Sequence, residues 1–243
     1  MAQTGFHLYR VFESEACHGS VLQNALAAYN DAMSNSEARP ALVSPVVKIL
    51  LLANVIMFFL EPGSMRFLIT HFALWPLPPP GPVLPDAGSF QPWQLISYAF
   101  LHGSLMHLLL NMYALWLFGT ALEQLWGSRN FALYYFLSVL GAGLTQLLVV
   151  SGSSQPYPTI GASGGVFGIL LAYGMFFPNH RLMLLFPPVA IKAIWFVVIY
   201  GVITLIFGIT GTASGVAHFA HLGGMLTGFL MILYWLQHPP KRR

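Results

Sequence analysis

The sequence predicts an all-α polytopic membrane protein built as a bundle of six transmembrane helices. Hydrophobic residues make up 56% of the 243 residues and charged residues only 7%, whereas about a quarter of the residues of a soluble domain are charged. The mean hydropathy of +0.69 points the same way. Six apolar runs follow one another after residue 45, each near the ~20 residues that cross a bilayer. This pattern excludes an ordinary soluble domain.

The runs divide the chain into a membrane domain with two flanking segments. Residues 1–45 are mixed and polar, and we expect them to form a short helix or to be disordered on the cytoplasmic side. Residues 237–243 form a basic cytoplasmic tail. The membrane domain covers residues 46–236, and its long proline-rich connection after the first run is expected to lie in the membrane interface. We place the six spans at about residues 46–60, 105–125, 131–150, 161–177, 191–209 and 216–236.

Charge gives the orientation. If the N-terminus is cytoplasmic, nine of the ten Lys and Arg residues fall on the cytoplasmic side and only Arg66 falls outside, as the positive-inside rule requires. Six spans then place both termini in the cytoplasm. The net charge of +3 is accounted for by topology and does not suggest nucleic-acid binding. The single cysteine, Cys17, excludes an intramolecular disulfide and a multi-cysteine zinc site.

Polar residues gather at one predicted depth. The second, fourth and sixth spans run inward from the outer surface, so residues early in each share the outer half of the bilayer. Polar groups at that depth are costly and are expected to meet one another or water. The residues concerned are His107 and Asn111 in the second span, Ser163 in the fourth, His218 and His221 in the sixth, and His102 just before the second.

Ser163 lies in a glycine-rich frame that has two interpretations. The glycines can let two helices approach closely, with Ser163 making an interhelical hydrogen bond. Alternatively, Ser163 is a nucleophile, which needs a histidine base and donors for an oxyanion. No Asp or Glu accompanies the cluster, so this second interpretation predicts a serine–histidine dyad without an acidic third member.

Three motifs in this order resemble the rhomboid family of intramembrane serine proteases. They are His102-x4-His107-x3-Asn111, then Gly161-Ala162-Ser163-Gly164, then Ala220-His221-Leu222-Gly223-Gly224 followed by Gly228. The resemblance covers about residues 46–236 and implies the six-helix rhomboid-like bundle of the bacterial type, in the inner (cell) membrane. It also implies a serine endopeptidase that needs no cofactor and cleaves single-span membrane proteins near the outer leaflet.

The resemblance also implies residue roles. Ser163 is the expected nucleophile and His221 the base, with oxyanion donors from His107, Asn111 and the Ser163 backbone N–H. His102 and Gly161 are expected to support the site, and Phe167 to pack against the catalytic histidine. The expected helix-packing glycines are Gly164, Gly168, Gly224 and Gly228. We prefer His221 to His218 as the base because Gly224 and Gly228 follow His221 at i+3 and i+7, on the same helix face.

Two alternatives remain. Four histidines near one face could bind zinc or copper or conduct protons, although the chain lacks a His-Glu-x-x-His motif and a nearby carboxylate. The second alternative is a catalytically silent rhomboid-like protein that only binds helices. The protease interpretation predicts transmembrane-helix substrates and the lipid bilayer as partners, with no nucleic acid and no metal. The sequence carries no signal for an oligomeric state.

Overall fold

The structure, a computed structural model, describes residues 42–77, 88–150, 157–183, 188–211, 217–238 and 240. The helix or disorder expected within residues 1–45 therefore lies outside the described residues, as does most of the basic tail. The elements in chain order are α2 (Pro45–Phe72), α3 (Gln94–Ser97), η2 (Tyr98–Phe100), α4 (Leu105–Ala114), η3 (Leu115–Gly119), α5 (Thr120–Trp126), α6 (Ser128–Val150), α7 (Ser163–Phe176), β1 (Arg181–Met183), β2 (Ala190–Lys192), α8 (Ala193–Thr210) and α9 (His218–Gln237).

The prediction of an all-α polytopic membrane fold is confirmed. Within the described ranges, four helical segments are long and apolar enough to cross a membrane, and two further apolar helices are shorter. The second predicted span is one continuous rod that passes from α4 through the π-helical η3 into α5. The protein is an integral membrane protein. The four long segments are Leu105–Trp126, Ser128–Val150, Ala193–Thr210 and His218–Gln237, and the two short ones are Pro45–Leu60 and Ser163–Phe176.

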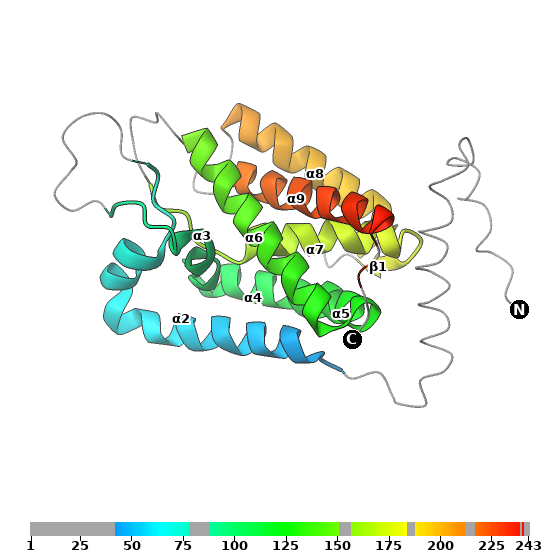
Figure 1. Cartoon of the computed structure of the whole chain (residues 1–243), viewed down its shortest axis with the longest axis horizontal. Coiled ribbons are helices and arrows are strands. Elements are labelled where there is room, and N and C mark those ends of the chain that lie inside the picture. The colour runs from blue at the N-terminus through cyan, green and yellow to red at the C-terminus, as the bar shows by residue number, and fades with distance from the viewer. Residues whose placement is uncertain are drawn as a thin grey trace, which may run out of the picture.

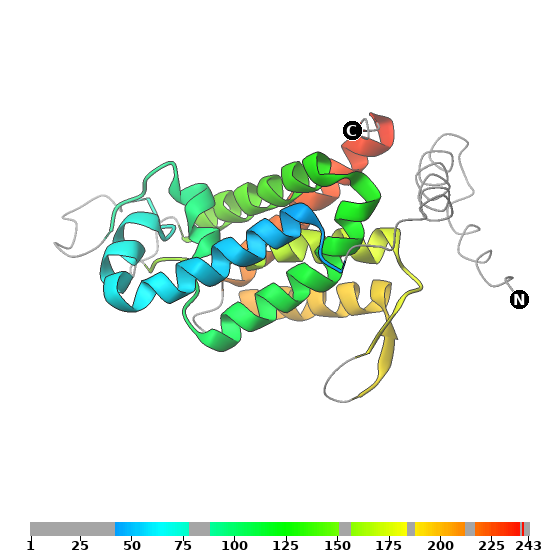
Figure 2. The ribbon, with the colours of Figure 1, turned by 90° about the horizontal axis from the view of Figure 1, so that it is seen from below.

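The helices are arranged around α7. Helices α6 and α9 run beside it, α2 lies on one side of the bundle, and α8 lies at the opposite edge (Figures 1 and 2). Nearly every residue of α7 is buried, whereas α8 buries only Ala193, Val197 and Thr204. Most of the other α8 residues are apolar and at least partly exposed, and α8 is the least buried of the four membrane-length segments.

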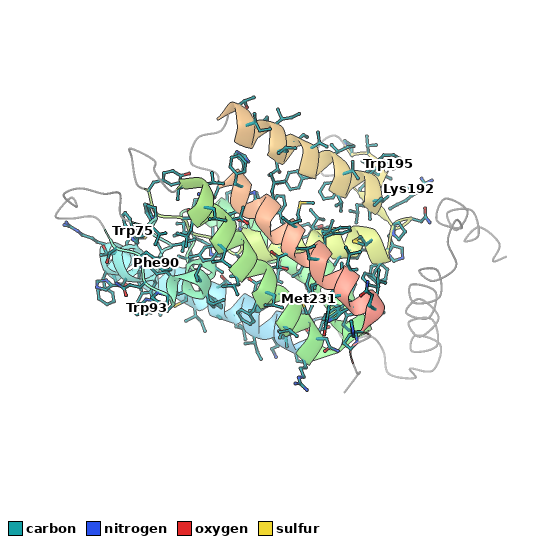
Figure 3. The ribbon with its side chains drawn as sticks, turned by 45° about the horizontal axis from the view of Figure 1, so that its top comes forward. Trp75, Phe90, Trp93, Lys192, Trp195 and Met231 are labelled. Atoms are coloured by element: carbon teal, nitrogen blue, oxygen red, sulfur yellow. The ribbon has the colours of Figure 1, made fainter. Side chains whose placement is uncertain are left out.

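Tryptophans lie near both ends of the bundle. Figure 3 shows Trp75, Phe90 and Trp93 at one end, and Lys192 with Trp195 at the other. Trp93 and Trp195 are both more than half exposed, as expected for rings at the two membrane–water interfaces. Trp75, at the same end as Trp93, is instead buried, and its indole N–H donates to the Ile69 carbonyl.

The first helix is longer than the apolar span placed at about residues 46–60. Helix α2 continues past Pro62 to Phe72 and bends near that end (Figure 1). The Ser64 hydroxyl donates to the Leu60 carbonyl at 2.9 Å, a bond from residue i to residue i−4 of the kind that bends helices. The extra turns persist because Leu68 is buried in a small apolar cluster with Ala73 and Leu101. Tertiary packing therefore outweighs the tendency of Pro62 to end the helix.

The connection between α7 and α8 contains a small hairpin that the sequence did not predict. Strands β1 and β2 pair antiparallel, with Arg181 opposite Lys192. Residues 191 and 192, predicted to begin the fifth span, belong to β2, so α8 begins at Ala193.

A buried carboxylate fixes the start of α2. Glu123 is 3% exposed and accepts hydrogen bonds from the backbone N–H groups of Val46 and Val47, each at 2.9 Å. The Ser128 hydroxyl donates to the same carboxylate at 2.6 Å. The first N–H groups of a helix have no intrahelical partner, and Glu123 supplies one from α5. This contact joins α2 to α5 and α6 at the end of the bundle away from the start of α7 (Figure 1).

Candidate active site

Ser163 is the first residue of α7, and a glycine shapes the chain that leads into it. The fourth span was predicted to begin at Gly161, but the helix begins two residues later. Gly161 has φ +123°, a backbone conformation that residues other than glycine rarely adopt. A Cβ at Gly161 would also lie 2.7 Å from His107 Cε1. Glycine is therefore required here for backbone conformation and for space beside His107.

The segment before Ser163 is tied to the connection that follows α2. Thr159 and Leu74 exchange two backbone hydrogen bonds, each 2.9 Å long. The Gly161 N–H donates to the Tyr98 carbonyl, also at 2.9 Å. These three bonds hold the entrance to α7 in place, and with it the Ser163 side chain.

The structure brings Ser163 and His221 together. His221 Nε2 lies 2.8 Å from Ser163 Oγ, within hydrogen-bond distance. The His221 ring stacks on Phe167, one turn along α7, with centroids 4.1 Å apart and planes 9° apart. Among the side chains that the structure describes, no carboxylate contacts the His221 ring. Ser163 and His221 thus form a two-residue arrangement backed by an aromatic ring.

His218 does not reach Ser163. Its ring centroid is 6.2 Å from that of His221, and its other ring neighbour is Phe207 on α8, at 5.7 Å. Both ring nitrogens of His218 are buried without a hydrogen-bond partner among the described residues. Of the two histidines on α9, His221 is the one adjacent to the serine.

Glycines on α7 and α9 bring these two helices into backbone contact. A Cβ on Gly224 would overlap the carbonyl oxygen of Gly164, and one on Gly228 would lie 3.4 Å from the Gly168 Cα. A Cβ on Gly168 would in turn meet the Ser138 hydroxyl on α6. Small residues permit such close approach between membrane helices. The contact sets the distance between Ser163, next to Gly164, and the first turn of α9.

The remaining predicted site residues lie on or before α4. His107 faces Gly161, as described above, and its ring centroid is 5.0 Å from that of His102. The Asn111 side-chain amide donates to the His107 backbone carbonyl at 2.9 Å. Neither His107 nor Asn111 hydrogen-bonds to Ser163 within the described residues. His107 lies on the Gly161 side of the site, and Asn111 is bonded to His107 one turn further along α4.

His102 precedes the membrane-spanning part of α4 and is fully buried. Burial, together with the smaller effect of the neighbouring His107, lowers the pKa of His102 to about 4. His102 is therefore neutral near pH 7 and adds no positive charge to this end of the bundle.

The histidines do not converge on a common point. In the ranges that the structure describes, no group of three or more His, Cys, Asp and Glu side chains is placed to hold a metal ion. The metal-binding alternative gains no support from the described residues.

Comparison with protein families identifies the chain. A model of the Rhomboid domain matches residues 89–238, which is more than half of the sequence and includes Ser163, His221 and the other predicted site residues. The chain belongs to the rhomboid family. The matched region runs from the connection after α2 to the end of α9.

Individual rhomboid relatives are also similar to the chain. RHOMBOID-like protein 4 of Arabidopsis thaliana is 32% identical over 147 residues, which cover 60% of this chain and 35% of that protein. Rhomboid protease GluP of Bacillus subtilis is 37% identical over 137 residues, or 56% and 25% of the two chains. Rhomboid-like protease 3 of Toxoplasma gondii is 29% identical over 152 residues, or 62% and 54%. The chain spans between a quarter and about half of the length of these relatives.

Sequence reasoning missed two features of this rhomboid site. One is the tether of Thr159 and Gly161 to Leu74 and Tyr98. The other is Tyr200 of α8, which stacks on Phe167 from a helix that carries none of the predicted site residues. Neither has a local sequence signal, because each joins residues that are far apart along the chain.

Proposed function

We propose that this rhomboid-family protein is an intramembrane serine endopeptidase in which Ser163 is the nucleophile and His221 the general base. The 2.8 Å contact between Ser163 Oγ and His221 Nε2 carries the proposal. As Oγ attacks a peptide carbonyl, His221 accepts its proton and then gives it to the leaving amine. Water then releases the acyl group by the same proton transfers.

The surroundings of Ser163 suit an oxyanion. Ser163 opens α7, and the first N–H groups of a helix have no intrahelical acceptor and carry partial positive charge. His107 lies beside Gly161, and Asn111 follows it one turn along α4, so both can supply side-chain donors. In this proposal they stabilise the tetrahedral intermediate together with the Ser163 N–H.

The length of α7 supports a reaction below the membrane surface. Its 14 residues rise about 21 Å, whereas the hydrocarbon core is about 30 Å thick. If α7 ends at the inner surface, Ser163 lies several Å inside the outer leaflet. Water must reach that depth, and the polar residues of the site provide partners for it.

The proposed orientation places both termini in the cytoplasm and Ser163 in the outer half of the bilayer. It rests on the nine-to-one distribution of Lys and Arg. Reporter fusions after Gln237 and within residues 1–45 should report cytoplasm, and fusions near Ser153 should report the opposite side. A chain with its ends on different sides would overturn this topology.

The proposed substrates are single-span membrane proteins cut near the outer end of their transmembrane segment. A peptide bond inside an intact helix is shielded by the helix's own hydrogen bonds, so the substrate must unwind locally before Ser163 can attack. Small residues at the scissile bond, and Gly or Pro in the turns that follow, would favour this unwinding.

The test of the proposed function is reaction with a serine-directed fluorophosphonate, with the modified residue mapped by mass spectrometry. Wild-type protein should carry the label on Ser163. Ser163→Ala should remove the label and His221→Ala should strongly reduce it. Ser138→Ala changes a buried serine of the neighbouring helix α6 and should label normally. Label on another serine, or undiminished labelling of Ser163→Ala, would show that Ser163 is not the nucleophile.

A further inference from the structure

Four aromatic rings from three helices form a continuous stack that ends on His221. His221 of α9 stacks on Phe167 of α7, and Phe167 stacks on Tyr200 of α8 with centroids 5.0 Å apart and planes 19° apart. Tyr200 stacks in turn on Phe196, at 5.7 Å and 20°. The His221 ring is therefore connected to α8 through two successive ring contacts.

Phe167 is held between two rings. Its plane is nearly parallel to those of His221 and Tyr200, and these two rings do not contact one another in the described structure. Two near-parallel rings cannot share one face of Phe167 without touching, so Tyr200 backs Phe167 on the face opposite His221. This sandwich fixes the tilt of Phe167, and Phe167 fixes the plane of His221.

His221 depends on this support because few other contacts set its orientation. Within the described residues, the only hydrogen bond of its ring is the one with Ser163, and no described carboxylate contacts its Nδ1. Ring stacking is directional, with preferred offsets and angles. Without it, the imidazole could turn away from the line that joins Nε2 to Oγ.

We infer that Tyr200 is a positioning residue for His221, acting through Phe167. This inference rests on the proposed function and adds to it a residue on α8, a helix outside the three rhomboid motifs. Loss of the Tyr200 ring frees Phe167 to tilt, and the population of His221 rings aligned with Ser163 falls. A small misplacement of a catalytic group lowers the rate of the chemical step more than it lowers binding.

Tyr200 can be changed without disturbing the core. It is 42% exposed, and α8 buries only three residues. A Cβ added at the neighbouring Gly201 would lie 3.3 Å from the Met225 methyl group, and methionine is a flexible side chain that adapts to nearby changes. An effect of Tyr200 on catalysis can therefore be separated from an effect on folding.

The experiment compares Tyr200→Leu, Tyr200→Met and Tyr200→Phe in the full-length protein. The first two remove the ring and keep an apolar side chain, whereas the third keeps the ring. Tyr234→Leu is the matched control, because Tyr234 is an exposed tyrosine of α9 that stacks on His238 instead of on a residue of the site. The readouts are kcat and KM on a single-span model substrate, the rate of fluorophosphonate labelling, and Tm.

Tyr200→Leu and Tyr200→Met should lower kcat and the labelling rate between about two- and tenfold, as expected for one aromatic pair. KM and Tm should stay close to wild type, and Tyr200→Phe and Tyr234→Leu should match wild type in every readout. Because Tyr200 acts through Phe167, Tyr200→Leu should have no further effect in a Phe167→Leu background.

Two outcomes would overturn the inference: wild-type labelling rates in both Tyr200→Leu and Tyr200→Met, or losses that multiply fully with Phe167→Leu. Either result would leave the proposed function standing, provided that the label still maps to Ser163. Labelling that does not depend on Ser163 would overturn the proposed function itself.

Discussion

Gly224 of α9 lies directly against the backbone of Gly164 of α7, where a Cβ would overlap the Gly164 carbonyl oxygen. Ser163 immediately precedes Gly164, and His221 lies three residues before Gly224 on the same helix face. The backbone contact between the two helices therefore lies next to the contact between Ser163 Oγ and His221 Nε2. Packing and the candidate chemistry depend on the same pair of glycines.

Gly224→Ala should therefore lower both stability and activity. The added methyl group meets backbone, which cannot move aside as a flexible side chain can, so we expect a cost of about 1–3 kcal/mol and a wider gap between Ser163 and His221. Thermal unfolding in detergent and a proteolysis assay measure the two effects. Gly63→Ala is the matched control, because a Cβ there meets nothing within 4 Å. Unchanged Tm and activity in Gly224→Ala would contradict the close packing of α7 and α9.

Glu123→Gln should destabilise the protein without removing the activity of the folded fraction. The carboxylate accepts three hydrogen bonds, and its amide substitute presents an NH2 group to at least one of those donors, at a cost of about 1–3 kcal/mol. Ser128→Ala, which removes one donor only, should cost less. Chemical denaturation and specific activity check both points. A catalytically dead but fully stable Glu123→Gln would be inconsistent with a role confined to the far end of the bundle.

Asn111→Ala should lower kcat by a factor of about 10² to 10³, as the loss of one oxyanion donor does in known serine proteases. The control is Asn130→Ala on α6. Asn130 makes the same kind of bond to the carbonyl four residues earlier, Trp126, also at 2.9 Å, but lies at the opposite end of the bundle. Equal losses of kcat in the two variants would mean that Asn111 only stabilises its own helix and does not stabilise the oxyanion.

Local patterns explain how much of this arrangement the sequence could predict. Apolar runs of membrane-spanning length gave the helical fold, because a lipid environment leaves the backbone few other choices. The spacing of Gly224 and Gly228 after His221 indicated that His221, and not His218, lies near Ser163, since residues three and seven apart share a helix face. Both inferences needed information from one helix at a time.

What the sequence could not provide lies between distant segments. The continuation of α2 to Phe72 depends on the burial of Leu68 against Leu101, which overrides the helix-stopping tendency of Pro62. The bonds from Glu123 to Val46 and Val47 join residues more than 70 positions apart. The contact of Tyr200 with Phe167 likewise arises only when α8 packs against α7.

Substrate helices with weakened hydrogen bonding should be cut faster. A panel of single-span substrates in which the Gly and Pro residues of the transmembrane segment are replaced by Leu should lose most of its cleavage, because an intact helix shields the scissile bond. Mass spectrometry of the products gives both the rate and the position of the cut. Cleavage in the cytoplasmic half, or rates that ignore these replacements, would argue against a site in the outer leaflet.

The most direct test is cleavage of one such substrate, reconstituted in liposomes, by wild type and by the Ser163→Ala, His221→Ala and His218→Ala variants. Nucleophile and base act as a unit, so Ser163→Ala and His221→Ala should each abolish the product, and the double variant should behave like either single one. His218→Ala should keep substantial activity because its ring does not reach Ser163. An active His221→Ala protein beside an inactive His218→Ala protein would contradict the assignment of His221 as the base.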